Sequence, residues 1–232
     1  MTVSELRLKS GYVCVLCKDR RGHTVPDGET FGGNQGWFDG EKDGYISSLG
    51  CGLIACADIL LYKSGRARIT QEEYMEFVRS LNKGMMKVRK KIGLNGLSMA
   101  WGMRKLLKER GLPYRASWCF SKRKILPRIE EMLKNDFPVC IAAGPVVCRK
   151  EKKQEYGVDF YTDDGKGGFT LPSWRSGRVK DHYVTVTAVI RTEDRTMLEI
   201  SSWAEKYYID WEQYKEYISL RRSFFSNILR IR

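Results

Sequence analysis

Helix-like patterns of apolar and polar residues recur in five stretches of the sequence. Positions 53–62 are apolar or small except for Asp58, and they predict a buried helix that begins after Gly52 and ends near Gly65. Thr70 is followed by two acidic residues and predicts the start of a second helix, with its apolar stripe at Tyr74, Phe77, Val78 and Leu81. Further helices are predicted over residues 97–110, 121–133 and 211–220.

Runs rich in β-branched and aromatic residues predict the strands, most of them in the second half of the chain. The predicted strands cover residues 12–16, 114–120, 137–143, 181–190, 197–202, 206–210 and 227–232. Residues 146–180 are polar and rich in glycine, which predicts a long excursion with room for a hairpin, either a lid or a partner surface. Because the helices come first and the antiparallel strands last, the order predicts an α+β fold.

The composition is that of a globular protein without a membrane span. Of the 232 residues, 42% are hydrophobic and 30% are charged, and no run of about 18 apolar residues occurs. The first residues lack the apolar core of a signal peptide, and seven cysteines in no small-scaffold spacing fit reduced thiols, so a cytoplasmic location is predicted. Cys14 and Cys17 lie near His23, but no second ligand pair follows at zinc-ribbon spacing. We therefore expect no metal and no cofactor.

Positive charge is concentrated in one segment. From Arg79 to Lys124 there are fourteen Lys and Arg residues against one acid, Glu109, so this segment carries 14 − 1 = +13, which equals the net charge of the whole chain. Such a segment can meet nucleic acid, anionic lipid or an acidic partner, and it is equally typical of the solvated faces of helices. No recognition-helix or RNA-stacking motif accompanies it, so no specific nucleic-acid partner is predicted.

Cys51 is the residue best placed to act as a nucleophile. It lies between Gly50 and Gly52, which allow a sharp turn, and it falls in the first turn of the predicted helix. Unpaired amides and the positive end of the helix dipole favour a thiolate at such a position. The alternative is a small core cysteine, which is the role we expect for Cys56, five residues further along the helix.

A thiol nucleophile needs a base, and the sequence contains only two histidines. His182 follows Asp181 at the start of a strong strand, and the next strand carries Ser201, Ser202 and Trp203. A Cys–His pair in hydrogen-bond reach gives an activated nucleophile, and a third polar group fixes the tilt of the imidazole. Ser201 or Ser202 is predicted to orient His182, and Trp203 to shield the pair from water.

These residues resemble the papain-like cysteine peptidases. In that family an Asp-His strand is followed by an Asn-Ser-Trp-Gly strand, and here Asp181-His182-Tyr183-Val184 is followed by Ser201-Ser202-Trp203-Ala204. His182 and Ser201 lie 131 and 150 residues after Cys51, within the family's usual separations of about 130 to 150. The single Cys-Gly, with Phe137-Pro138-Val139 and Gly144-Pro145, is most similar to the bacteriocin-processing peptidase-like branch.

The resemblance implies one papain-like domain over residues 1–232. Residues 1–30 would be an N-terminal extension, 31–135 a mostly helical half that carries Cys51, and 136–232 a mostly β half that carries His182, packed as an antiparallel sheet. The substrate cleft would lie between the halves. Its further candidate residues are Asn34, Trp37, Gly50, Gly52, Asp181, Ser202 and Trp203.

Two positions depart from the family pattern. The glutamine that serves as oxyanion-hole donor is commonly six residues before the cysteine, and that position holds Tyr45. Gln35 fills the role if residues 39–48 are an insertion, and such a donor is worth about 3 kcal/mol in the transition state. The position of the orienting asparagine holds Ser201, whose hydroxyl orients an imidazole less firmly.

The sequence therefore predicts a cysteine peptidase or related thiol acyl-transfer hydrolase that cleaves a peptide or isopeptide-type amide. Cys51 is the nucleophile and His182 the acid and base. Ser201 or Ser202 is the orienting residue, and Gln35 forms the oxyanion hole with the backbone amide of Cys51. A second hypothesis is an inactive papain-like fold that binds an anionic partner through residues 79–124. A third, an acyl-coenzyme-A-dependent transferase, needs a carboxylate beside His182.

Overall fold

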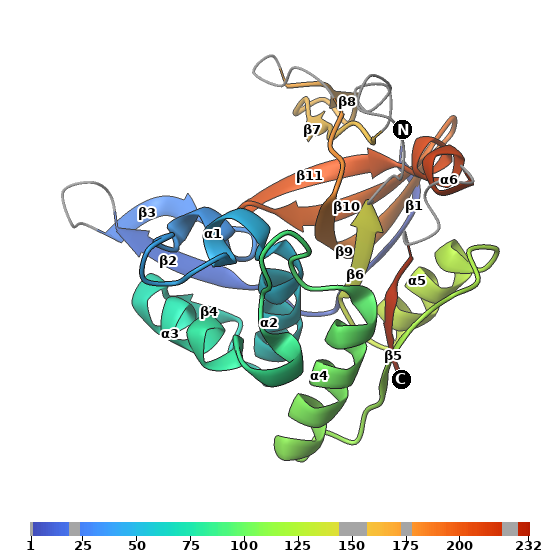
Figure 1. The fold of residues 1–232 in the computed structure, drawn as a ribbon. Helices are drawn as coiled ribbons and strands as arrows, with labels where there is room; N and C mark the ends of the chain where they lie inside the picture. Colours follow the sequence, from blue (N-terminus) through green and yellow to red (C-terminus); the bar gives the residue numbers. More distant parts are fainter. Residues whose placement is uncertain (1, 19–23, 144–156, 173–177, 220–226) are drawn as a thin grey trace.

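The chain folds into helices and strands that together surround one long buried helix (Figure 1). The computed structural model describes residues 2–18, 24–143, 157–172, 178–219 and 227–232. Its α-helices are α1 (Ile46–Leu49), α2 (Cys51–Lys63), α3 (Gln71–Leu81), α4 (Gly96–Glu109), α5 (Ile125–Lys134) and α6 (Trp211–Ser219). Two short 3-10 helices are η1 (Gln35–Trp37) and η2 (Gly84–Met86).

The main sheet has five strands, and four of them come from the C-terminal part of the chain. They are β1 (Thr2–Arg7), β6 (Val139–Ala143), β9 (His182–Thr192), β10 (Thr196–Ser202) and β11 (Glu205–Asp210). The order is β1-β9-β10-β11, with β6 also paired to β9, and every pair is antiparallel. The mixture of helices and an antiparallel sheet agrees with the predicted α+β class.

The smaller sheets bring distant segments together. They consist of β2 (Cys14–Lys18), β3 (Thr24–Glu29) and β4 (Arg68–Thr70); of β5 (Ala116–Trp118) and β12 (Leu229–Ile231); and of β7 (Thr162–Asp163) and β8 (Phe169–Thr170). The β7–β8 hairpin lies inside the predicted excursion of residues 146–180, of which 146–156 and 173–177 lie outside the described residues, as do Gly144 and Pro145.

The N-terminal segment is not an extension, which corrects the predicted division of the chain. Strand β1 pairs along β9, with Thr2 opposite Thr192, and β2 runs parallel to β4. Of the strands that precede the first helix, β2 lies at the predicted strand of residues 12–16, whereas β1 was not predicted. Strand β1 pairs with the backbone N–H and C=O groups along one edge of β9, and β2 does the same along β4. Without these partners the backbone groups of those edges would be unpaired.

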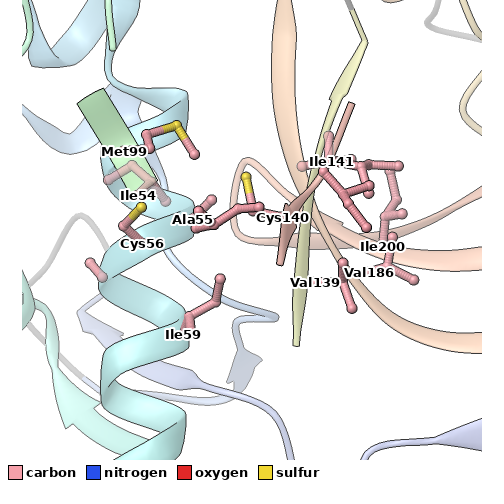
Figure 2. Close-up of a cluster of buried hydrophobic side chains, with 14 of the residues drawn as sticks. Ile54, Ala55, Cys56, Ile59, Met99, Val139, Cys140, Ile141, Val186 and Ile200 are labelled. Atoms are coloured by element: carbon pink, nitrogen blue, oxygen red, sulfur yellow. The ribbon is translucent and has the colours of Figure 1, made fainter. Parts of the chain in front are cut away.

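Helix α2 is buried on all sides, as its apolar sequence predicts. Every residue from Gly52 to Tyr62 is buried, and one side of the helix packs on strands β6 and β9. Figure 2 shows Ala55 of α2 facing Cys140 of β6, with Met99 of α4 close to Ile54, whereas Ile141 lies on the other side of β6 near Val186 and Ile200. Cys56 lies in this core with no exposed surface, which confirms its expected role.

Helices α3 and α4 begin at residues whose side chains cap them, whereas α5 begins later than predicted. Thr70 and Glu73 form a reciprocal capping box at the start of α3, and Asn95 caps α4. Helix α5 begins at Ile125 rather than at Ser121 as predicted. The reason is Pro127, which lacks a backbone N–H and is tolerated only in the first turn of a helix.

Candidate active site

Cys51 is the first residue of α2, and Gly50 is the N-cap. The residue is partly exposed, but its thiol is almost fully buried against the start of β9. Burial raises the pKa of the Cys51 thiol above its ordinary value, although the backbone N–H groups of Tyr183, Gly52 and Cys51 act in the opposite direction. This direction is opposite to the one expected from the helix start alone, because the cost of burying a charge exceeds the effect of the helix-end amides.

His182 is the first residue of β9, and its ring contacts two side chains of the neighbouring hairpin. The ring atom Nε2 lies 2.8 Å from the Ser202 hydroxyl oxygen. The indole of Trp203 stacks on the imidazole, with ring centroids 4.5 Å apart and planes 15° from parallel. A hydrogen bond at one edge and an aromatic ring over one face together fix the orientation of the imidazole.

The β10–β11 hairpin positions these two partners through a two-residue turn. Ser202 is opposite Glu205, so Trp203 and Ala204 form the turn, and their φ angles are 51° and 65°. Left-handed φ at both central positions matches the twist of a tight hairpin, although it is costly for residues other than glycine. Asp181 also has a positive φ, 55°, so His182 is flanked by unusual backbone on its own strand and on the neighbouring turn.

Of the two serines predicted to orient the imidazole, Ser202 and not Ser201 is bonded to it. The hydroxyl of Ser201 donates to the backbone carbonyl of Phe31 at 2.6 Å. Successive side chains of a strand point to opposite faces, so only one of two adjacent serines can meet His182. Ser201 instead ties β10 to the loop that leads to Gln35.

Gln35, the first residue of η1, brings a third part of the chain to the site. Its amide Nε2 donates to the Ser47 carbonyl at 3.1 Å, which fixes the side chain beside the helical turn that leads into Cys51. Its Oε1 atom is buried and has no hydrogen-bond partner among the described residues. An amide nitrogen carries two hydrogens, so one N–H of Gln35 remains for a second acceptor. Tyr45, at the family's usual glutamine position, is exposed.

These side chains line one small pocket. It is bordered by Cys51, His182, Gln35, Ser201, Ser202 and Trp203, with Gly33, Ile54, Ala55, Asp58, Tyr183, Val184 and Thr185. Three sequence-distant parts of the chain thus meet at one place: the loop before η1, the start of α2, and strands β9 and β10.

The other predicted cleft residues lie outside the lining of this pocket. Asn34 caps η1 and donates to the carbonyl of Trp203 at 3.2 Å, so it supports the loop. Trp37 packs edge-on against Tyr74 in the core. Gly50 and Gly52 allow close packing around the helix start, since a Cβ at Gly52 would lie 2.9 Å from the Met99 sulfur.

Asp58 is an acidic pocket residue to which the sequence analysis assigned no role. It lies seven residues after Cys51 on α2, and its side chain is 1% exposed. The Tyr74 hydroxyl donates to it at 2.6 Å, the Gly33 amide at 3.2 Å, and the Tyr12 hydroxyl at 3.3 Å. Burial raises the pKa of Asp58 to about 6. The sequence does single out Asp58, because it is the one carboxylate in an apolar helix and lies two turns after Cys51.

Within the described ranges no group of three or more His, Cys, Asp or Glu side chains is arranged to hold a metal ion. His23 lies outside those ranges. In the same part of the chain no helix combines the length and apolar character needed to cross a bilayer. Comparison of the chain with protein-family models, curated proteins and solved structures gave no match. Assignment of a function therefore depends on the geometry of the site itself.

Proposed function

We propose that this protein is a cysteine peptidase or a related thiol acyl-transfer hydrolase acting on a peptide or isopeptide-type amide. The observation that carries the proposal is the pocket that Cys51, His182 and Gln35 share, with Ser202 bonded to the imidazole. A thiol, an imidazole with an orienting partner and an amide donor are the groups that acyl transfer requires.

The raised pKa of Cys51 defines how the first step proceeds. Because burial keeps the thiol protonated, His182 removes the proton as the sulfur attacks the carbonyl carbon, rather than beforehand. For Nδ1 to accept this proton, the Nε2–H must donate to the Ser202 oxygen. The imidazolium then protonates the leaving amine, and a water activated by the same ring releases the acyl group from the sulfur.

Two donors would stabilise the oxyanion. One is the free N–H of the Gln35 amide, and the other is the backbone N–H of Cys51 at the start of α2. The contact between Gln35 and Ser47 supports this role, because it holds the amide in place before substrate arrives. Each such donor is worth about 3 kcal/mol in the transition state.

Competitive alkylation tests the proposal. A peptidyl epoxide is added near neutral pH, and the rates of modification of Cys51 and Cys119 are followed by peptide mass spectrometry. Cys119 is a matched internal control, since it is also partly exposed and burial raises the pKa of its thiol. We expect Cys51 to react at least about tenfold faster, and His182→Ala to slow Cys51 about 100-fold without changing Cys119. Equal rates for the two thiols would contradict the proposal.

A non-catalytic fold that binds a partner is the second candidate, and two observations favour it. The raised pKa of Cys51 and the serine at the orienting position both weaken the nucleophile. The acyl-coenzyme-A-dependent transferase receives less support, because the group bonded to Nε2 is a hydroxyl and Asp181 lies outside the pocket lining. Equal alkylation rates of Cys51 and Cys119, with an intact fold, would favour the non-catalytic candidate.

A further inference from the structure

The exposed apolar side chains of this protein are unevenly distributed. In the described part of the chain, eight large hydrophobic side chains are exposed, and five of them lie between residues 85 and 120: Met85, Ile92, Leu97, Trp101 and Phe120. Ile92 is 68% exposed and Trp101 62% exposed. These residues lie inside the basic segment 79–124, whose charge of +13 equals the net charge of the chain. Large apolar side chains clustered on a surface mark an interaction site.

Helix α4 presents one side of this surface. Its buried face consists of Gly96, Met99, Ala100, Gly102, Met103, Leu106 and Leu107. The opposite face carries Leu97 and Trp101 one turn apart, followed at helical spacing by Lys105 and Lys108, and all four are exposed. Figure 1 shows α4 on the outside of the helical part of the molecule. The helix is therefore amphipathic, with an outer face that is itself half apolar and half basic.

A tight turn just before α4 carries further exposed basic and apolar side chains. Arg89 and Gly93 exchange two backbone hydrogen bonds, of 2.9 and 3.0 Å, so Lys90, Lys91 and Ile92 form the tip. All three tip residues are exposed.

The preceding η2 packs on α4, with Met86 so close to Gly102 that a Cβ there would lie 2.3 Å from the sulfur. This packing fixes the turn beside the helix. We call the combined surface the basic–apolar face and define it by Met85, Lys90, Lys91, Ile92, Leu97 and Trp101.

The positive charges of this face are largely uncompensated. Of the eight Lys and Arg side chains from Lys83 to Lys108, only Lys105 has a carboxylate partner within the described residues, Glu109 at 3.7 Å. Uncompensated cations beside exposed apolar groups favour a partner that offers both anions and an apolar phase. An RNA strand offers phosphates and base faces, but three of the four apolar side chains here are aliphatic and cannot stack on bases.

We infer that the basic–apolar face docks onto the surface of an anionic lipid bilayer. Lys90 and Lys91 would meet acidic headgroups, while Ile92, Leu97 and Trp101 enter the boundary between headgroups and acyl chains. Basic residues on a helical surface together with Trp and Leu are typical of proteins that lie on a membrane without crossing it. The inference is independent of any chemistry at Cys51.

Vesicle flotation with the full chain tests this inference. The probe is a phosphatidylcholine vesicle with about 30 mol% phosphatidylserine, compared with phosphatidylcholine alone. We expect the chain to float only with the anionic vesicles, and the double variant Lys90→Ala/Lys91→Ala to bind about 30-fold more weakly. Ile92→Ser/Trp101→Ser should reduce binding at least about tenfold.

Matched controls remove two lysines, or two exposed apolar side chains, that lie outside the basic–apolar face. Lys134→Ala/Lys166→Ala changes the net charge equally, and Val3→Ser/Leu171→Ser removes two other exposed apolar side chains, so both should bind like wild type. Circular dichroism checks the fold of each variant. Absence of binding to anionic vesicles overturns the inference. Binding that is lost with Lys90 and Lys91 but unchanged in Ile92→Ser/Trp101→Ser also overturns it, because the face would then recognise a polyanion or an acidic protein.

Discussion

Replacing Asp58 with Asn should abolish a specific dependence of stability on pH. Its carboxyl is almost fully buried, and Tyr74, Gly33 and Tyr12 all donate hydrogen bonds to it. These three donors favour the ionised form, yet burial outweighs them and raises the pKa of Asp58 to about 6. The folded protein therefore retains this proton over a pH range in which the unfolded chain has already released it.

The sign and size of the effect follow from that difference. An unfolded aspartic acid has a pKa of about 3.9. Between about pH 4 and pH 6 the folded state binds more protons than the unfolded state, so the free energy of unfolding falls as the pH rises. The contribution is fully present below about pH 4 and fully lost above about pH 6. Two pKa units at about 1.4 kcal/mol each give a loss of about 3 kcal/mol.

Urea unfolding followed by tryptophan fluorescence at about pH 4 and about pH 7 measures this term. The free energy of unfolding of wild type minus that of Asp58→Asn should fall by about 3 kcal/mol between the two conditions. Asn also loses one acceptor for the three donors, which costs about 1–3 kcal/mol at every pH and leaves the difference between conditions unchanged.

Asp43 provides a control of opposite sign. Its hydrogen bonds from Arg79 lower the pKa of its carboxyl, so the corresponding difference for Asp43→Asn should rise with pH. A wild type minus Asp58→Asn difference that is constant, or that rises with pH, would refute the reasoning. In that case the three donors, rather than burial, determine the charge of Asp58.

Three further predictions concern the site and its scaffold. Ser202→Ala should slow alkylation of the nucleophilic thiol about fivefold, since a neutral hydrogen bond contributes about 1 kcal/mol, whereas Ser201→Ala should mainly lower the free energy of unfolding; the reverse pattern would return the orienting role to Ser201. Thr70→Ala should lower the free energy of unfolding by about 1 kcal/mol in urea, and an unchanged midpoint would contradict the capping box. Gly96→Ala places a Cβ 2.2 Å from an indole ring and should cost about 1–3 kcal/mol, whereas Gly11→Ala, with open space around it, should cost little.

The fold was predictable where local sequence determines structure. The apolar residues of α2 favour a buried helix, and the β-branched residues of β9 favour a buried strand. Both elements form as predicted. The pairing of β1 with β9 joins Thr2 to Thr192, and nothing in the local pattern of either strand selects that partner. Long-range pairing depends on which sheet edge is open, and that is decided only when the core has assembled.

For the site, residue types were easier to predict than contacts. Cys51, His182 and Gln35 were identified from their surroundings in sequence, and all three line one pocket. The choice between Ser201 and Ser202 required the register of β10 against β9, because a shift of one residue exchanges the two faces of a strand. To predict that the pKa of Cys51 is raised, one must know how deeply its thiol is buried. That depends on the whole fold and not on the glycines beside it.

The parts of the site are held together by a network that does not touch the sulfur. The amide of Phe31 donates to the Ala204 carbonyl at 2.8 Å, and that of Ala204 to the Gly33 carbonyl at 3.0 Å. These bonds join the loop that precedes Gln35 to the hairpin that carries Ser202. Asp58 binds the Gly33 amide and so joins the same loop to α2. Gln35, the Ser202 hydroxyl and Cys51 are thus joined through one hydrogen-bonded frame, and disturbing any of these contacts should shift two parts of the candidate site relative to each other.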